Sequence, residues 1–163
     1  MAARCTNWTF LGRVPYAATA ALQVELREAL RRGEGPERLL LLDHEPVFSL
    51  GRNATAADIL WSPAELAEHG VEVQPTDRGG QVTFHGPGQL VGYPIVHLPA
   101  PVDVVAHVRR LEEAMIRLCA EFGVVVERVD GRSGVWVRAD DRGPDRKLGA
   151  IGVRVSQNVT MHG

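Results

Sequence analysis

Lysine is almost absent from this sequence of 163 residues. Of its 18 basic residues, 17 are arginine and only Lys147 is lysine. An arginine keeps its proton in a protein, whereas a lysine can release one when its surroundings lower its pKa. Two interpretations of Lys147 stay open. A compositional preference for arginine would leave one lysine on a solvated face, or this position requires an amine.

Other features are scarce as well, and each scarcity excludes a class of protein. The formal net charge is -2, so the basic excess of a nucleic-acid-binding protein is missing and no nucleic-acid partner is expected. The longest apolar run, near 39–42, has the length of a strand, so we expect no membrane partner. Residues 1–5 lack the apolar core of a secretory signal. These observations favour a cytoplasmic protein.

Cysteine is also rare. Cys5 and Cys119 form neither a metal-binding spacing nor a disulfide framework. Cys119 lies beside the apolar stripe of a predicted helix, which is typical of a small buried hydrophobe rather than of a reactive thiol. The histidines are scattered, without an H-E-x-x-H spacing. Segment 86–92 misses the dinucleotide-binding glycine pattern by one residue, and no G-x-x-x-x-G-K pattern exists. No metal and no cofactor are therefore expected.

Glycine, in contrast, is concentrated in one place. Segment 78–89, RGGQVTFHGPGQ, holds four glycines and one proline around a short apolar run. Glycine permits turns with positive φ and close approach of the backbone to a ligand, whereas Val82-Thr83-Phe84 favours a strand. The pattern predicts a turn, a short strand and a second turn, with Arg78 and His85 at the ends. A segment of this kind is typical of a binding site.

Periodicity and capping signals predict three helices and nine strands along the chain. The helices are expected at 16–32, 63–69 and 104–122, the second of them capped by Ser62 and the third by Asp103. The strands are expected at 8–12, 39–43, 47–50, 71–74, 82–84, 90–98, 124–126, 134–137 and 148–155. This order is neither strict βαβ alternation nor all-strand. We therefore predict a single α+β domain over residues 1–163, with a mixed, mainly antiparallel sheet packed against helices.

A covalent acyl-transfer site is one chemistry that these residues could serve. Such a site needs a nucleophile, a group that lowers the pKa of that nucleophile, and a cavity for the acyl chain. Lys147 could supply the second part, because an ammonium group favours a neighbouring thiolate. Small and apolar residues around 82–84 and 150–152 could supply the third. Neither Cys5 nor Cys119 has the setting of a nucleophile, so the residues by themselves indicate only one glycine-rich site and one singular lysine.

Segment 78–94, RGGQVTFHGPGQLVGYP, resembles the signature of the lipoyl(octanoyl) transferases. Four further segments match that family: HEPVFSLGR at 44–52, DGRSGVW at 130–136, KLGAIGV at 147–153 and TMHG at 160–163. The resemblance thus covers essentially the whole chain. It implies the α+β fold that is shared by biotin and lipoate protein ligases.

The resemblance also implies a reaction and its partners. The family transfers an octanoyl group from acyl carrier protein to a lysine of the lipoyl domains of 2-oxoacid dehydrogenase and glycine-cleavage complexes. The group passes through a thioester on an enzyme cysteine, and no ATP is used. An octanoyl-[acyl-carrier-protein]:protein N-octanoyltransferase of the cytoplasm is therefore expected.

Site residues follow from the resemblance position by position. Lys147 matches the lysine that lowers the pKa of the nucleophile. The matching substrate-binding residues are Arg78, Gly79, Gly80, Gln81, Val82, Thr83, Phe84, His85, Ala150, Ile151, Gly152 and Gly163. The family's cysteine lies in a P-C-G element beyond the histidine-glycine pair that corresponds to His162-Gly163. We therefore expect the 163 residues to lack the C-terminal part of the catalytic domain.

Two other functions stay open on the sequence alone. An ATP-dependent lipoate ligase would share the fold, but it would need a nucleotide-binding glycine pattern where this chain has Gln81 and a Gly-Pro-Gly turn. A non-catalytic module that binds acyl groups or carrier proteins would need no nucleophile. Binding of ATP would favour the ligase, and binding without transfer would favour the module.

Overall fold

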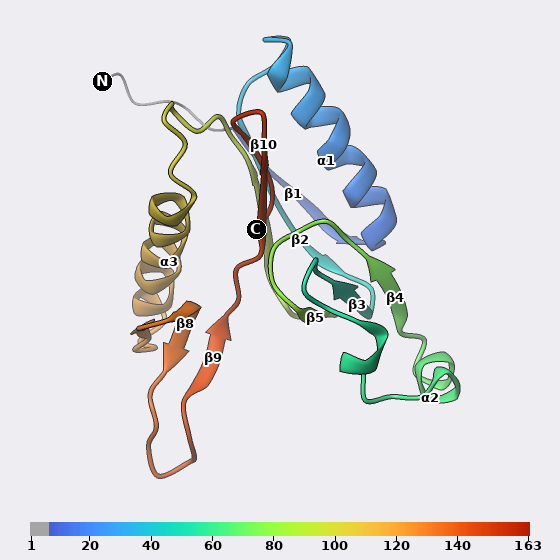
Figure 1. The fold of residues 1–163 in the computed structure, drawn as a ribbon. Helices are drawn as coiled ribbons and strands as arrows, with labels where there is room; N and C mark the ends of the chain where they lie inside the picture. Colours follow the sequence, from blue (N-terminus) through green and yellow to red (C-terminus); the bar gives the residue numbers. More distant parts are fainter. Residues whose placement is uncertain (1–6) are drawn as a thin grey trace. The chain divides into compact units, whose positions relative to one another are not determined.

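The computed structural model describes residues 7–163, which form two compact units. The first unit comprises residues 7–98 and 152–163, and the second comprises residues 99–151 (Figure 1). Among the paired strands of this part of the chain, five of seven pairings are antiparallel and two are parallel. The predicted α+β class with a mixed, mainly antiparallel arrangement is confirmed. Cys5 lies outside the described residues. Within residues 7–163, no helix is long and apolar enough to cross a membrane.

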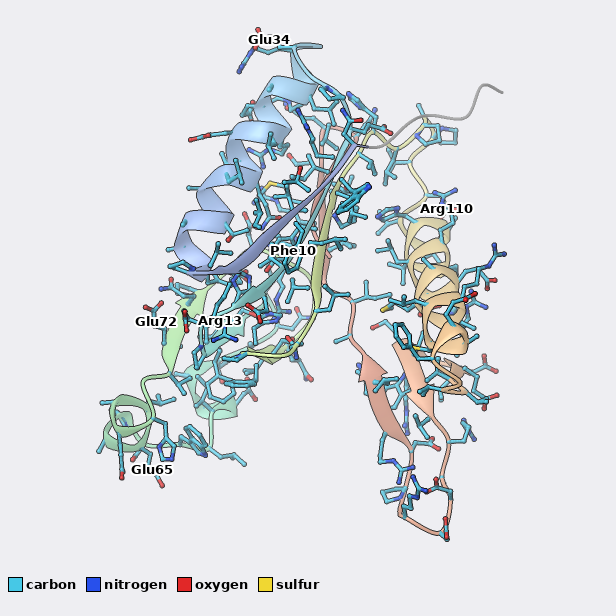
Figure 2. All side chains as sticks on the ribbon, turned by 180° about the vertical axis from the view of Figure 1, so that it is seen from behind. Phe10, Arg13, Glu34, Glu65, Glu72 and Arg110 are labelled. Atoms are coloured by element: carbon cyan, nitrogen blue, oxygen red, sulfur yellow. The ribbon has the colours of Figure 1, made fainter. Side chains whose placement is uncertain are left out.

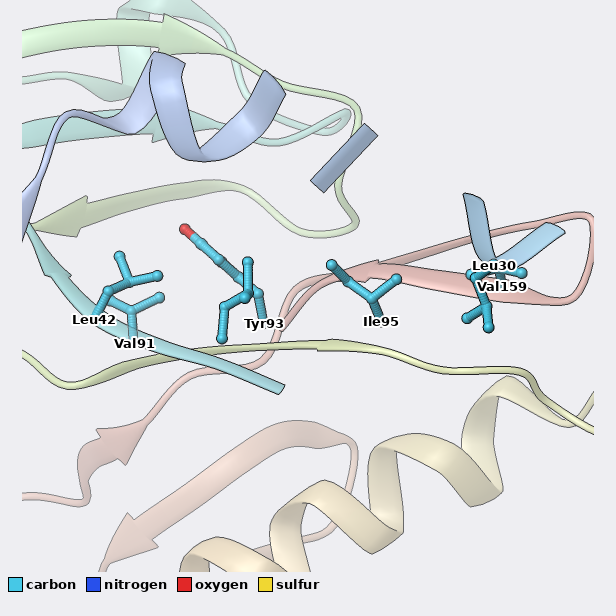
Figure 3. Packing of buried hydrophobic residues seen from close by; sticks show 7 residues of the cluster. Leu30, Leu42, Val91, Tyr93, Ile95 and Val159 are labelled. Atoms are coloured by element: carbon cyan, nitrogen blue, oxygen red, sulfur yellow. The ribbon is translucent and has the colours of Figure 1, made fainter. Parts of the chain in front are cut away.

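The core of the first unit lies between one helix and a three-stranded sheet. Strands β1 (Asn7–Val14), β2 (Arg38–His44) and β6 (Val91–Ile95) form this sheet in the order β1-β2-β6. Helix α1 (Tyr16–Arg31) makes the crossover from β1 to its parallel neighbour β2. Alternate residues of β2 and β6 turn to the same face and pack with α1. The buried cluster is Leu30, Leu40, Leu42, Val91, Tyr93, Ile95 and Val159 (Figure 3).

A second sheet of this unit carries the glycine-rich segment. Strands β3 (Val47–Leu50), β4 (Glu72–Pro75) and β5 (Val82–His85) pair in the order β4-β3-β5. A 3₁₀ turn, η1 (Ala56–Asp58), and helix α2 (Pro63–Glu68) connect β3 to β4. The Ser62 hydroxyl accepts a hydrogen bond from the Glu65 backbone N–H, and the Glu65 carboxylate accepts one from the Ser62 N–H. This capping box confirms the predicted start of α2, on which Glu65 is seen in Figure 2.

A C-terminal hairpin completes the first unit. Strands β10 (Val153–Ser156) and β11 (Val159–His162) pair in an antiparallel manner. The Thr160 hydroxyl donates to the carbonyl of Pro94 (2.6 Å), and the Thr160 N–H donates to the carbonyl of Val96 (3.0 Å). These bonds hold β11 beside the end of β6. They place His162 and Gly163 next to the core of the unit.

The second unit consists of one long helix and a small antiparallel sheet. Helix α3 (Val104–Glu121) begins after Asp103, whose side chain accepts a hydrogen bond from the Ala106 N–H (2.8 Å). Strands β7 (Glu127–Val129), β8 (Arg132–Val137) and β9 (Arg146–Gly149) pair in the order β7-β8-β9. The buried Glu112 carboxylate joins helix to sheet, because it accepts hydrogen bonds from Arg109, Arg128 and the Gly134 N–H.

Two strand predictions in the last third of the chain are wrong. Residues 124–126 precede the strand that forms, because the two-residue turn Asp130-Gly131 pairs Val129 with Arg132 and sets β7 at 127–129. The predicted strand 148–155 is two strands, β9 and β10, separated by residues 150–152. Lys147 therefore lies within β9. Cys119, predicted to be buried, is free and half-buried on α3.

Candidate active site

A buried arginine holds the glycine-rich segment of the first unit in place. Arg78 donates from Nη2 to the carbonyls of Ser49 (2.6 Å) and Gln81 (2.8 Å), and from Nη1 to the carbonyl of Gly79 (2.9 Å). Its Nε and Nη2 also lie 3.2 and 2.9 Å from the Ser49 hydroxyl oxygen. All of these acceptors are uncharged oxygens, and burial lowers the pKa of the guanidinium. The charge of Arg78 therefore acts on the neighbouring groups.

The hydroxyl of Ser49 connects Arg78 to His85. The Ser49 Oγ lies 3.2 Å from Nε2 of His85, whose Nδ1 lies 2.7 Å from the amide oxygen of Gln89. An amide oxygen can only accept, so the Nδ1 of His85 carries the proton and its Nε2 is an acceptor; the single Ser49 hydroxyl proton has this Nε2 and the Thr83 carbonyl (3.3 Å) as its two acceptors. Burial, aided by the charges of His44 and Arg78, lowers the pKa of His85 to about 4 although Gln89 opposes this. The imidazole is thus neutral at physiological pH.

His85 belongs to a cluster of four rings, whose other members are Tyr16, His44 and Tyr93. The ring centroids of Tyr16 and His44 lie 5.7–6.1 Å from that of His85, and those of His44 and Tyr93 lie 5.8 Å apart. His44 Nδ1 donates to the carbonyl of Val14 (2.9 Å), so its Nε2 accepts from the Tyr93 hydroxyl (2.8 Å). Burial lowers the pKa of His44 and raises the pKa of Tyr16 and Tyr93. The cluster is therefore uncharged.

A third neutral histidine, His162, lies at the end of β11. His162 Nε2 donates to the Asp77 carboxylate (3.1 Å), which also forms an ion pair with Arg154. Burial and the charges of Arg78, Arg154 and Arg27 lower the pKa of His162 to about 4. A pocket of about 390 Å³ adjoins this histidine. It is lined by Tyr16, Ala20, Val24, Pro75, Thr76, Asp77 and His162.

Glycines from three separate segments meet beside Arg78. The Gly79 N–H donates to the carbonyl of Val153 (3.0 Å), and the Gly152 N–H donates to the carbonyl of Gly163 (2.5 Å). A Cβ atom on Gly152 would lie 2.8 Å from the Gly79 carbonyl oxygen and 3.1 Å from Nη1 of Arg78. Real Cβ atoms essentially never come as close as 2.8 Å. The absence of side chains is therefore what lets these backbone segments approach one another.

The other predicted site residues are distributed over both units. In the first unit, Gly80 and Gln81 are exposed, Val82 and Thr83 are half-buried on β5, and Phe84 is 44% exposed. In the second unit, Lys147 is exposed on β9, and it is followed by the exposed Ala150 and the half-buried Ile151. The structure thus brings Arg78, Gly79, His85, Gly152 and Gly163 together within one unit. Lys147, Ala150 and Ile151 belong to the other unit.

The sequence did not single out Ser49, Tyr16 or Tyr93. Ser49 lies within segment 44–52, which matches a family segment, but its contact with Arg78 depends on the pairing of β3 with β5. Tyr16 and Tyr93 look like ordinary core residues of a helix and a strand. Only the tertiary structure brings their rings to the buried histidines.

The fold is that of a lipoate protein ligase. A bi-partite lipoate protein ligase from Thermoplasma acidophilum superimposes with a TM-score of 0.71 at 16% identity, over 96% of this chain and 58% of that one. A lipoate-protein ligase A bound with ATP gives a TM-score of 0.69 at 14% identity, over 96% and 64% of the two chains. At such low identity the likeness concerns the fold alone.

The family follows from the sequence comparison. The model of the lipoyl protein ligase A/B catalytic domain matches residues 15–163, and the chain belongs to this family. The octanoyltransferase of Mycolicibacterium smegmatis is 53% identical over 153 residues, which are 94% of this chain and 64% of that protein. The octanoyltransferase of Salinispora tropica is 50% identical over 152 residues, which are 93% and 68% of the two chains. The chain thus spans about two thirds of the length of these relatives.

Proposed function

We propose that this chain is the catalytic part of an octanoyltransferase that acts in protein lipoylation. The observation that carries the proposal is the identity of 50–53% to proteins named octanoyltransferase over nearly the whole chain. In this proposal the reaction takes place in the cytoplasm. The donor is octanoyl-acyl carrier protein, and the acceptors are lipoyl domains of 2-oxoacid dehydrogenase and glycine-cleavage complexes.

The chemistry of the first unit supports a site for an uncharged acyl group. Burial lowers the pKa of three histidines, His44, His85 and His162. The N–H groups of Arg78 donate hydrogen bonds to neutral oxygens of its own chain. The donors of Arg78 are thus engaged within its own chain and not by a carboxylate or a phosphate. A site of this kind suits a hydrocarbon chain that ends in a thioester carbonyl.

In the proposed reaction the acyl group moves twice. The thiolate of a cysteine outside these 163 residues attacks the thioester carbonyl of the donor, and the bond to the carrier's sulfur breaks as the enzyme thioester forms. The lysine amine of the lipoyl domain then attacks that thioester; the amide bond forms as the bond between the acyl carbon and the cysteine sulfur breaks, and a proton of the amine passes to that sulfur. Lys147 favours the thiolate by its charge and shuttles the proton.

Transfer without a nucleotide tests this proposal. The full-length natural protein is incubated with octanoyl-acyl carrier protein and a lipoyl domain, and the mass of the lipoyl domain is measured. We expect one octanoyl group on the lipoyl domain in the absence of ATP. A lipoyl domain that stays unmodified without ATP would contradict the proposal.

A second candidate, an ATP-dependent lipoate ligase, is favoured by one observation: the fold is shared with a lipoate-protein ligase A bound with ATP. The same assay separates the two functions when free octanoate and ATP replace the acyl carrier. Modification only in that arm would establish a ligase. Binding of octanoyl carrier protein with no transfer in either arm would establish a non-catalytic module.

A further inference from the structure

The only lysine of the chain lies over the ring of a tryptophan. Trp136 on β8 is the register partner of Lys147 on β9, and Lys147 Nζ is 4.7 Å from the centroid of its ring. A cation at this distance from an indole face is attracted by the negative face of the ring. Because register partners turn to the same face of a sheet, the pairing of β8 with β9 brings the two side chains together.

Three carboxylates of this sheet and its β8–β9 loop form ion pairs with arginines. Asp140 pairs with Arg146 (2.8 Å), and Asp145 pairs with Arg132 (3.7 Å) and Arg138 (3.5 Å). The third, Glu127 on β7, pairs with Arg138 (3.2 Å). Among residues 7–163, no ion pair is recorded for Lys147. Its cation is therefore held by a ring that can neither accept nor supply a proton.

Trp136 also lies between Lys147 and Glu127, the acidic residue at the same register position of the sheet. The register runs from Glu127 on β7 through Trp136 on β8 to Lys147 on β9. Two strand spacings, about 10 Å, separate the outer strands. An ammonium that reached Glu127 would be fixed in its protonated form by the carboxylate. The indole occupies the position that such a contact would need.

The indole is held by packing and by contacts of cations with its ring face, without a hydrogen bond. Its Nε1–H is buried and has no hydrogen-bond partner within the described residues. Arg132 lies over the same ring at 5.2 Å from its centroid. A Trp136→Phe variant would therefore keep a ring face and lose no hydrogen bond, whereas a Trp136→Leu variant would keep an apolar side chain and lose the ring.

We propose that Trp136 is the positioning residue for Lys147: its ring holds the ammonium group in place, apart from the Glu127 carboxylate and with no proton acceptor bonded to it. The role of this contact in catalysis rests on the proposed function. A lysine side chain has many rotamers, and a ring contact restricts them without a proton acceptor.

Selective ¹³C labelling of lysine in the full-length protein tests the contact directly, and the Lys147→Arg variant identifies the signal. We expect the ε-methylene protons of Lys147 to be shifted upfield by the ring current of Trp136. The shift should persist in part in Trp136→Phe and vanish in Trp136→Leu. Trp8→Leu is the matched control, because Trp8 is 68% exposed in the other unit, and it should leave the signal unchanged.

The kinetics of octanoyl transfer test whether the contact between Trp136 and Lys147 contributes to catalysis. A ring contact of this kind predicts a roughly tenfold lower kcat for Trp136→Leu, with KM for the octanoyl carrier unchanged and most of the rate restored in Trp136→Phe. An unshifted Lys147 signal in the wild-type protein would overturn the inference, whatever the activity. A shifted signal combined with full transfer by Lys147→Arg would instead overturn the catalytic role proposed for Lys147, and leave only the contact.

Discussion

At the scale of the single residue, the site is organised by one buried positive charge. Arg78 has only uncharged acceptors, so its field extends to the imidazoles around it. Burial and this field together keep His85 and His162 neutral. The two histidines can therefore donate and accept hydrogen bonds beside the glycine-rich segment without adding charge to it.

Neutral buried histidines predict a loss of stability in mild acid. Both His85 and His162 have a pKa of about 4 in the folded protein, against an ordinary value near 6.5. Between these values the unfolded chain binds more protons, so the free energy of unfolding rises with pH. We expect urea unfolding midpoints to fall steadily from about pH 6.5 towards pH 4, each histidine contributing up to roughly 3 kcal/mol.

The His85→Gln variant is the control for this pH dependence. Glutamine cannot titrate, so the variant should lose the His85 part of the slope between about pH 6.5 and pH 4 and keep the part due to the other histidines whose pKa is lowered. An unfolding midpoint that is constant across this interval in the wild-type protein would contradict the neutral state of both histidines. The measurement needs no activity.

The residues that the sequence could identify are those with an unusual chemical identity or setting. Lys147 is the only lysine, and Arg78 opens a segment rich in glycine. Ser49 and Trp136 have neither an unusual chemical identity nor an unusual setting in the sequence. Their roles depend on strand register, which places Ser49 opposite Thr83 and Trp136 opposite Lys147. Strand register follows from the pairing of segments that are distant in the sequence, so no local sequence pattern predicts it.

At the scale of the element, the close approach of backbone segments is the feature most open to test. We expect Gly152→Ala to lower the free energy of unfolding by about 1–3 kcal/mol. It should also reduce octanoyl transfer, because the new Cβ would lie 2.8 Å from the Gly79 carbonyl. Urea unfolding and the transfer assay measure the two effects.

Gly35→Ala is the matched control for that substitution. A Cβ atom at Gly35 would have no heavy atom within 4 Å, and neither Gly35 nor Gly152 has a positive φ. The control should therefore keep full activity and stability. Equal effects of the two substitutions would show that crowding at Gly152 is not the cause.

The buried carboxylate of α3 predicts a second effect at this scale. Burial alone would raise the pKa of Glu112, but hydrogen bonds from Arg109, Gly134 and Arg128 outweigh it and lower the pKa. Glu112→Gln removes the charge that these donors share, and we expect it to destabilise the protein by about 3 kcal/mol in urea unfolding.

The neighbouring Glu113 provides the control, because it pairs with Arg117 and Arg128 on the exposed side of α3. Glu113→Gln should have a much smaller effect, since an exposed ion pair contributes little. If the two variants are equally stable, the buried carboxylate does not hold helix and sheet together.

Elements with local signals were predicted well. The capping box of α2 and the Asp103 cap of α3 both form as the sequence indicates, because a cap involves residues only three positions apart. The strands at 124–126 and 148–155 were predicted wrongly from apolar content. The Asp130-Gly131 turn and the break at residues 150–152 fix the observed strands, and these depend on pairing partners.

At the scale of the whole molecule, the predicted fold class and family are both confirmed. The sequence could not predict that residues 99–151 form a compact unit of their own, since no linker or change of composition marks its limits. The predicted binding residues 78–85, Gly152 and Gly163 belong to the first unit, whereas the predicted catalytic Lys147 belongs to the second, together with Ala150 and Ile151. The assignment of Lys147 to catalysis therefore needs a chemical test.

Formation of an acyl-enzyme is the measurement that tests the central claim most directly. The full-length natural protein is incubated with octanoyl-acyl carrier protein, without ATP and without a lipoyl domain, and its intact mass is followed over time. We predict a gain of one octanoyl group that hydroxylamine removes, and a rate at least about a hundredfold lower in Lys147→Arg. No gain in mass by the wild-type protein would contradict the account.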